Sequence, residues 1–523
     1  MKSFERLMLS YLKDITDPLL DPLQFAYRAN RSVDDAVNMA LHFILQHLDS
    51  PGSYARILFV DFSSAFNTII PALLRDKLFQ LNVPDSMCSW ITDFLTDRRQ
   101  FVRLGTHVSD LQHISTGSPQ GCVLSPLLFS LYTNGCTSGH QSVKLLKFAD
   151  DTTLIGLISD GNESAYRGEI DRLVSWCSTN NLELNSLKTV EMTVDFRKDP
   201  APRPPVILCD SPVSSAESFC FLGTTITKEL KWAQNISYLT KKAQQRMYFL
   251  RQLKKFLLPV KMLVNFYTAI IESVLTSSIT VWFAAATARD KAKLQRVIHS
   301  AEKVIGCSLP SLQELYFSRS RRRAAKIAAD PSHPGNELFR SLPSGKRLRS
   351  IKTRTSRHKN SFFPTAGCTD WDIFRSTTNS LDEYTDTVSS YIYFCEDSII
   401  PSCTKVSYNN DKPWFTAKLR WLRSEKEAAF RSGDKGKYKE VKYRFSEEVR
   451  RAKTEHGERM KQQFQTNDSA SVWKGLKAVT NYKPRAPHSV NGLQLANSLN
   501  EYYCRFERLW NSPDPPNPPP TSY

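Results

Sequence analysis

Three aspartates in two short segments have the residue types and the setting of a metal site. Asp61 follows the apolar run 57–60, which is the pattern of a buried strand with a polar residue at its end. Asp150 and Asp151 lie between two apolar, β-branched runs and predict the turn of a hairpin. Adjacent carboxylates in an apolar hairpin repel each other and lose solvation, and a divalent cation relieves both costs. A plain turn is the alternative for the Asp-Asp pair, because aspartate favours turns.

Two Mg²⁺ ions on such carboxylates, about 3.5–4 Å apart, can activate a hydroxyl and stabilise a pyrophosphate leaving group in in-line phosphoryl transfer. Five further motifs surround the aspartates. Each is weak evidence alone, but their order along the chain makes a chance match negligible. They occupy residues 24–28, 31–36, 116–126, 184–189 and 221–223. Together with the aspartates, this ordered set resembles the reverse transcriptases of non-LTR (LINE-type) retrotransposons, and most of all their jockey-like branch. The resemblance covers residues 1 to about 365.

The resemblance implies roles for individual residues. Asp61, Asp150 and Asp151 would hold two Mg²⁺ ions, for which Mn²⁺ can substitute, and Lys188 would neutralise or protonate the leaving pyrophosphate. A solvated surface lysine is the alternative for Lys188. Phe66 matches the steric gate that excludes a 2′-hydroxyl, although its residue type alone would favour a core position.

The remaining matched positions are expected to contact nucleotide, template or primer. Gln120 and Gly121 match the loop beside the template base and the incoming nucleotide, where a glycine permits a close backbone approach. The other positions are Arg28, expected at the nucleotide and template, and the primer grip formed by Phe221, Leu222 and Gly223.

The charge of the chain indicates a polyanionic partner. It has 70 Lys and Arg against 52 Asp and Glu, a net charge of +18 and a pI near 9.3. Simple solubility or attraction to an anionic membrane surface would also fit this charge. Apolar residues recur at helical spacing over 236–257. The cations predicted to face nucleic acid on that helix are Lys241, Lys242, Arg246, Arg251, Lys254 and Lys255.

The predicted fold class is α+β, a right-hand polymerase followed by basic, mostly helical segments. Residues 1–225 would form partial fingers and a palm with an antiparallel sheet, and 226–310 a helical thumb or connection. Residues 311–366 would form a basic segment that binds nucleic acid nonspecifically or is a solvated tail. Residues 367–507 would form a basic helical module and 508–523 a proline-rich tail.

The module 367–507 resembles the linker that precedes the palm in the family, and here it follows the polymerase. A fusion of two element copies and a misassembled gene are the two explanations. Its Trp414 and Trp421 could stack on bases or lie in the core of a small helical domain. The chain also starts inside the family's fingers, and the loss of the preceding basic strand is expected to weaken dNTP binding. No endonuclease domain precedes the polymerase, so nicking of target DNA is not expected.

The sequence predicts an intracellular protein in the nucleus, the cytoplasm or both. It contains no run of about 18 apolar residues and no secretory signal. Its eleven cysteines form no zinc-type cluster, which favours reduced thiols. We expect neither a transmembrane segment nor a membrane partner.

The resemblance therefore implies an RNA-directed DNA polymerase that binds template RNA, primer DNA and dNTPs. A catalytically impaired nucleic-acid-binding remnant of such an element is the alternative. Phe66 argues against a viral RNA-copying enzyme, because such an enzyme needs room for the 2′-hydroxyl.

Overall fold

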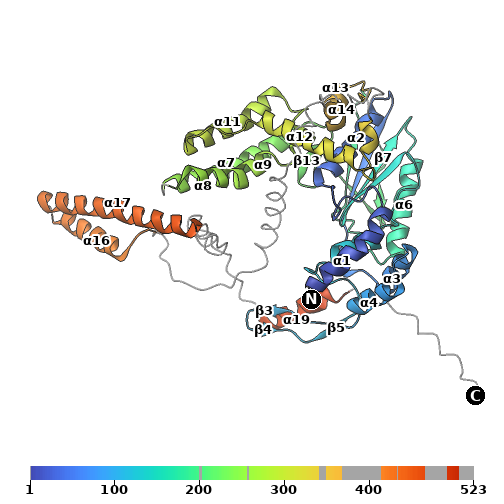
Figure 1. The fold of residues 1–523 in the computed structure, drawn as a ribbon, viewed down its shortest axis with the longest axis horizontal. Helices are drawn as coiled ribbons and strands as arrows, with labels where there is room; N and C mark the ends of the chain where they lie inside the picture. The colour runs from blue at the N-terminus through green and yellow to red at the C-terminus, as the bar shows by residue number, and fades with distance from the viewer. Residues whose placement is uncertain are drawn as a thin grey trace, which may run out of the picture.

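A computed structural model describes residues 2–198, 203–255, 258–340, 349–367, 414–432, 434–465 and 492–505 (Figure 1). The proline-rich tail and, within the predicted helical module, residues 368–413 and 466–491 lie outside the described residues. The described part is a mixture of helices and strands built around one five-stranded sheet, whose strand order is β11-β8-β1-β7-β6. The mixed α and β class predicted from the sequence is therefore present.

The sheet consists of β1 (Tyr54–Val60), β6 (Val143–Phe148), β7 (Asp151–Ile158), β8 (Val190–Val194) and β11 (Ser214–Ser215). Four of these strands pair antiparallel, as expected, but the short edge strand β11 runs parallel to β8. The sequence did not indicate this parallel pair, because a two-residue strand carries no periodicity from which its direction could be predicted.

Strand β1 lies at the centre of the sheet, and it is buried along its whole length and mostly apolar because both faces of the sheet are covered. Ile57 and Phe59 belong to a core shared with α2 (Val33–Leu48) and the C-terminal helices. Leu58 and Val60, which point to the other face, belong to a second core. That core includes residues of α1 (Lys2–Thr16), α3 (Pro71–Gln80), α4 (Asp85–Leu95), α5 (Ser125–Tyr132) and α6 (Ser164–Thr179).

One charged residue interrupts this apolar strand. Arg56 is buried in β1 and donates two hydrogen bonds to the carboxylate of Glu191 on β8, at 2.7 and 2.6 Å. It also lies 2.6 Å from Glu163. A buried guanidinium is tolerated only when carboxylates satisfy it in this way.

Four short hairpins surround the sheet. Two of them, near residue 105, pair β2 (Arg98–Gln100) with β5 (Gln112–Ile114) and β3 (Arg103–Leu104) with β4 (His107–Val108). The other two pair β9 (Ile207–Leu208) with β10 (Ser211–Pro212) and β12 (Ser218–Phe221) with β13 (Thr224–Thr227). Single-turn 3₁₀ helices lie at η1 (Asp17–Leu19), η2 (Ala65–Asn67) and η4 (Asn336–Phe339).

Helices follow the last hairpin. The long helix α7 (Ala233–Lys255) packs along α11 (Ala288–Ile305), and short helices lie between the two in the sequence. The next helix, α12 (Leu312–Ala329), returns to α2, where Arg323 lies 3.0 Å from the buried Asp35. The remaining elements are α8 (Val260–Phe266), the π-helix η3 (Tyr267–Glu272), α9 (Ser273–Leu275), α10 (Ile279–Trp282), α13 (Ser356–Lys359) and α14 (Phe362–Gly367).

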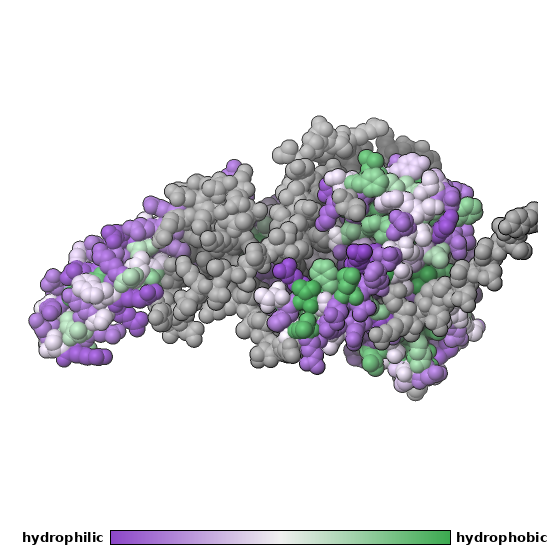
Figure 2. Space-filling model, turned by 90° about the horizontal axis from the view of Figure 1, so that it is seen from below, coloured by the Kyte–Doolittle hydropathy of each residue, from purple (hydrophilic) through white to green (hydrophobic). Residues whose placement is uncertain are grey.

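Two further parts come from the C-terminal third. Helices α16 (Ala417–Arg431) and α17 (Lys435–Gln465) form an antiparallel pair with a mostly hydrophilic surface (Figures 1 and 2). Trp421 on α16 is 56% exposed, so the prediction that it is a core residue is wrong, and Trp414 is half-buried. Helix α19 (Gly492–Tyr503) lies beside β3 and β4 (Figure 1).

No helix in the described ranges is long and apolar enough to cross a bilayer.

Candidate active site

The register of the central sheet brings the three aspartates to one end of neighbouring strands. Val60, the last residue of β1, pairs with Thr152 of β7, so Asp61 and Asp151 occupy opposite positions just beyond that pair. Phe148 pairs with Asp151 and closes the β6–β7 hairpin around Ala149 and Asp150. Ala149 has φ +59°, a left-handed conformation that makes the turn tight. The hairpin predicted from the sequence is present.

The electrostatics of the three carboxylates favour a bound cation. Burial raises the pKa of Asp150, and the nearby Asp61 raises it further. The pKa of Asp151 is raised by burial and then by Asp150 and Asp61. The Oδ2 atom of Asp61 is buried and has no hydrogen-bond partner. A positive charge between these groups would satisfy all three.

Carboxylate oxygens are the ligands that Mg²⁺ prefers, so this donor set fits the metal. Within the described residues, however, no three His, Cys, Asp or Glu side chains converge closely enough to form a ready-made metal cluster. The backbone register therefore positions the aspartates, and their side chains would have to turn toward one another to share an ion.

The loop at 184–189 is attached to the backbone of Asp61. Asn185 donates its backbone N–H to the Asp61 carbonyl at 2.9 Å, and the Asp61 N–H donates to Thr189 Oγ1 at 3.3 Å. Lys188 is thereby held with its Nζ 3.8 Å from Asp61 Oδ2. Its side chain is 72% exposed, so this ion pair adds little stability and the ammonium group remains accessible.

Phe66 follows Asp61 on the 3₁₀ turn η2 and is half-buried. One side of its ring packs on Phe129 of α5, with centroids 4.7 Å apart. Its carbonyl accepts the Ser118 N–H at 2.8 Å, which ties the 116–121 loop to the ring. The ring is partly buried and partly accessible to solvent, as expected for a side chain that borders a binding site.

Gln120 is exposed on this loop, and the adjacent Gly121 has φ +80°. No protein atom lies within 4 Å of the position that a Gly121 Cβ would take. The backbone conformation therefore accounts for this glycine, and only a ligand could make the close approach that the sequence suggested. Gly117 differs, because its Cβ would lie 2.7 Å from the Asn67 backbone.

The motif at 24–28 lies against the edge of β6. Phe25 donates its N–H to the Lys147 carbonyl, and Lys147 donates to the Leu23 carbonyl, both at 2.9 Å. This pairing brings Tyr27 to the aspartates: burial raises the pKa of Tyr27, and Asp150 raises it further. Sequence reasoning gave Tyr27 no role, and its place inside the motif was the one available signal.

Arg28 points away from this contact. Its guanidinium donates to the backbone carbonyls of Asp21, at 2.9 Å, and Asp17, at 3.3 Å. These bonds hold the N-terminal segment in place. A role for Arg28 in binding nucleotide or template stays a prediction.

Leu222 and Gly223 form the turn of the hairpin at residues 218–227 and have φ +47° and +81°. Two consecutive residues with positive φ are typical of a type I′ turn, which matches the twist of a two-stranded hairpin. Phe219 stacks on Phe59 of β1 with centroids 4.0 Å apart, and Phe221 lies 5.4 Å from the same ring. The hairpin is therefore fixed to the sheet two residues before Asp61.

The cations predicted on α7 have two different environments. Arg246 donates to the Ile270 carbonyl at 2.6 Å and Lys254 to the Ile305 carbonyl at 3.1 Å, so both attach α7 to neighbouring helices. Lys242 lies over the ring of Tyr238, which is 51% exposed. Four of the six cations are exposed: Lys241, Arg251, Lys255 and, despite its hydrogen bond, Lys254.

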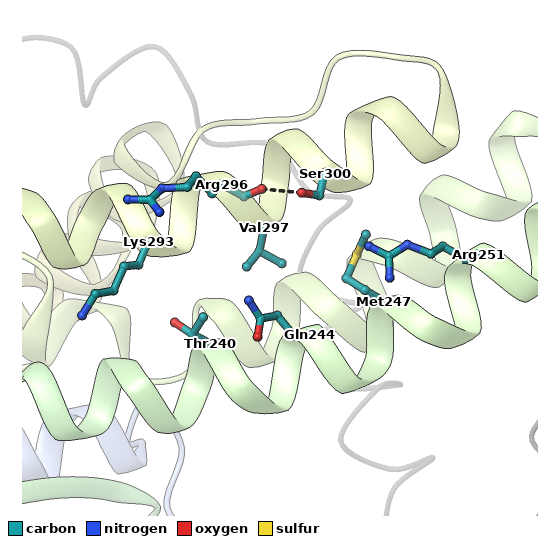
Figure 3. A pocket seen from close by; sticks show the side chains of 8 residues that line it. All are labelled: Thr240, Gln244, Met247, Arg251, Lys293, Arg296, Val297 and Ser300. Atoms are coloured by element: carbon teal, nitrogen blue, oxygen red, sulfur yellow. Dashed lines mark hydrogen bonds between the residues drawn. The ribbon is translucent and has the colours of Figure 1, made fainter.

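A groove of about 460 Å³ runs between α7 and α11 (Figure 3). Arg251 reaches it from α7, and Lys293 and Arg296 reach it from α11. Sequence reasoning missed the two α11 cations, although residues 288–305 show the same basic amphipathic pattern as α7. The other residues that line the groove are Thr240, Gln244, Met247, Val297 and Ser300.

Comparison with known proteins agrees with this geometry. The family described as reverse transcriptase (RNA-dependent DNA polymerase) matches residues 1–226, the part of the chain that carries every element of the aspartate site. A probable RNA-directed DNA polymerase from transposon BS of Drosophila melanogaster is 27% identical over 298 residues, covering 54% of this chain and 33% of the relative. The RNA-directed DNA polymerase from the mobile element jockey of the same species is 24% identical over 304 residues, covering 54% and 32%. Residues 1–226 therefore match the reverse transcriptase family, and the chain is similar to the RNA-directed DNA polymerases of LINE-type elements.

The chain spans about a third of the length of the two relatives. Among solved structures, one match is a telomerase from Candida albicans in complex with a fragment of telomeric RNA. The match covers 66% of this chain and 55% of the telomerase chain, with a TM-score of 0.34 and 14% sequence identity. A second family, described as the N-terminal part of alkylated DNA repair protein alkB homolog 8, matches residues 232–273, which lie in the helices after the last hairpin.

Proposed function

We propose that the chain is an RNA-directed DNA polymerase that extends a DNA primer on an RNA template. The backbone register that places Asp61, Asp150 and Asp151 at the same end of β1 and β7 carries this proposal. In it the five-stranded sheet is the palm, and the helices from α7 onward form the thumb and connection. The domain boundaries predicted from the sequence are part of the same proposal.

The divalent metal dependence of the family implies that Asp61, Asp150 and Asp151 hold Mg²⁺. When bound, two such ions supply activation of the primer 3′-hydroxyl and charge neutralisation at the leaving pyrophosphate. Lys188, already 3.8 Å from Asp61, would add a positive charge on the pyrophosphate side. Mn²⁺ has the same preference for oxygen ligands and would serve in its place.

The remaining residues would position the substrates. Phe66, supported from behind by Phe129, would occupy the space that a ribose 2′-hydroxyl needs. Gln120 and Gly121, on a loop hydrogen-bonded to Phe66, would lie beside the template base. The turn at Leu222 and Gly223 would hold the primer end, and such positioning can lower a barrier by several kcal/mol.

The basic groove between α7 and α11 would contact the phosphates of the template–primer duplex. Contacts to phosphates carry no sequence information, which suits an enzyme that copies any template. The exposed Tyr238 and Tyr248 on α7 add flat surfaces beside these cations. The basic surfaces would therefore bind RNA and DNA without sequence preference.

The test is primer extension by the full chain on a poly(rA) template with an oligo(dT) primer, dTTP and Mg²⁺. We expect extension by the parent and none by Asp151→Asn, which keeps the shape of the side chain and removes its charge. Extension by the variant at the parent rate would refute the proposal. RNA binding without extension by the parent would identify the alternative, a nucleic-acid-binding remnant.

A further inference from the structure

Helix α19 docks on the β3–β4 hairpin through a specific set of hydrogen bonds. Asn500 is 2% exposed, and its side chain donates to the Asp110 carbonyl at 2.8 Å and accepts from Gln100 Nε2 at 3.1 Å. Asn497 Oδ1 accepts the backbone N–H of Asp110 at 3.0 Å. Ala496 is fully buried on the same face. A buried asparagine satisfied on both sides fixes the rotation and the register of a helix.

This docking carries the end of α19 to the loop that follows Asp61. Arg505 donates through Nη2 to Ser64 Oγ at 2.9 Å. The guanidinium also lies over the Tyr502 ring, 3.9 Å from the centroid, and Nη1 donates to the Tyr502 carbonyl at 2.8 Å. Three contacts therefore hold the cation in one place, although 441 positions separate it from Ser64 in the sequence.

That place is close to the proposed nucleotide site. Ser64 lies three residues after Asp61 and two before Phe66, and three residues span at most about 11 Å. Arg505 is thus attached to the loop that joins Asp61 to Phe66, the two residues proposed to hold the metal ions and to border the sugar of the nucleotide. Guanidinium groups bind phosphate oxygens with planar, paired hydrogen bonds.

We propose that Arg505 is a substrate-binding residue: it contacts the triphosphate of the incoming dNTP and is delivered to the polymerase site by the docked helix α19. The inference rests on the proposed function for the identity of its ligand. The C-terminal segment is thereby part of the nucleotide site and not an appendage to it.

The contact between α19 and the hairpin is tested first, by a readout that needs no activity. Cys504 Sγ lies 3.4 Å from Gln100 Nε2, so the shorter thiol of a Gln100→Cys variant of the full chain should be joined to Cys504 by a short bismaleimide crosslinker. Mass spectrometry of the digested protein identifies the crosslink. Adding Ala496→Arg to that variant should abolish it, whereas Ser498→Arg, which adds the same charge on the exposed face, should not. Absence of the crosslink without Ala496→Arg would overturn the docking.

The role of Arg505 is tested by binding of a fluorescent dTTP analogue to the full chain on template–primer with Mg²⁺, followed by steady-state kinetics. We expect Arg505→Ala to weaken binding and raise the KM for dTTP about tenfold, with kcat changed less than twofold, and Arg505→Lys to restore part of the loss. Equal affinity of parent and Arg505→Ala would overturn the proposal, as would no binding by the parent. Triphosphate binding that depends on Arg505 without primer extension would refute the polymerase function alone.

Discussion

Individual side chains at the aspartate site match the proposed chemistry. In the absence of a bound cation, their arrangement costs folding free energy. Burial and Asp61 raise the pKa of Asp150, burial, Asp150 and Asp61 raise that of Asp151, and the buried Oδ2 of Asp61 accepts no hydrogen bond. Ser64, between Asp61 and Phe66, has φ +55°. Uncompensated charge and local strain of this kind are concentrated at functional sites.

The first prediction concerns the stability of the aspartate cluster. The folded-state pKa of Asp151 is raised, so its ionised form destabilises the fold above its ordinary pKa, and removing the charge should stabilise the protein. In EDTA, Asp151→Asn should raise Tm by about 1–3 °C, as measured by circular dichroism.

Mg²⁺ should reverse the order of the two melting temperatures, because it binds the folded parent more tightly than the variant. Asp171→Asn, on the exposed face of α6, is the matched control and should change neither value. A variant that melts below the parent in EDTA would contradict the repulsion between the carboxylates.

The second prediction concerns Phe66 as the steric gate. Phe66→Val keeps the contact with the core but removes the part of the ring that reaches beyond Phe129. The ratio of kcat/KM for dNTP to that for rNTP should fall at least about tenfold, equivalent to about 1.4 kcal/mol. Phe79→Val, at an exposed phenylalanine of α3, should leave the ratio unchanged. Unaltered discrimination in Phe66→Val would mean that the ring is only a packing residue.

At the scale of elements, some cations of α7 hydrogen-bond to neighbouring helices, whereas other cations of α7 and α11 line the groove between them. Arg246 and Lys254 cap carbonyls of neighbouring helices, whereas Arg251 and Arg296 face the groove from opposite sides (Figure 3). Residues of one type on one helix can therefore be expected to have different effects when they are substituted.

The third prediction uses this division. Replacing Arg251 and Arg296 together by alanine should lower the slope of log affinity for template–primer against log salt by roughly 1–2, because each phosphate contact contributes about 0.9. Arg246→Ala should leave the slope unchanged and lower Tm instead, since its partner is the Ile270 carbonyl. Fluorescence anisotropy over a salt series measures the slopes. Equal slopes for the parent and the double variant would exclude the groove as a phosphate site.

At the scale of the whole molecule, α13 and α14 pack against α2, so the segment after α12 returns to an early helix of the chain. His42 on α2 is buried against His358 and Phe363, with ring centroids 5.7 and 5.2 Å apart. His358 Nδ1 lies 2.7 Å from Asp49, and this contact and two hydrogen bonds from residues 354–355 lower the pKa of Asp49. Burial and the neighbouring His358 lower the pKa of His42 to about 4.

The fourth prediction is that this junction weakens in acid. Unfolded His42 takes up a proton near pH 6.5 and the folded side chain only near pH 4, so stability should fall as pH drops through that window. His42→Leu should reduce the loss between pH 7 and 4.5 by about 2–3 kcal/mol, as measured by denaturant unfolding. His140→Leu, at an exposed histidine, should retain the full loss. Parallel stability curves for the parent and His42→Leu would show that His42 is not the titrating group.

The sequence by itself determined the elements whose signals are local. The apolar run before Asp61, the β-branched runs around Asp150 and Asp151 and the amphipathic α7 each follow from residue periodicity over a few turns or strand positions. The order of the motifs also determined the family, because each motif has a fixed spacing that does not depend on knowing the fold.

The tertiary structure alone decided which distant residues meet. The pairing of Tyr27 with Asp150, the attachment of 184–189 to Asp61 and the contact of Arg505 with Ser64 link positions far apart in the chain, and periodicity carries no information about such pairs. The buried position of Arg56 could not be predicted for the same reason. A buried charge needs charged partners, and its partners Glu191 and Glu163 come from other parts of the chain. Side-chain identity sets the chemistry that a residue can perform, and long-range packing decides which residues perform it together.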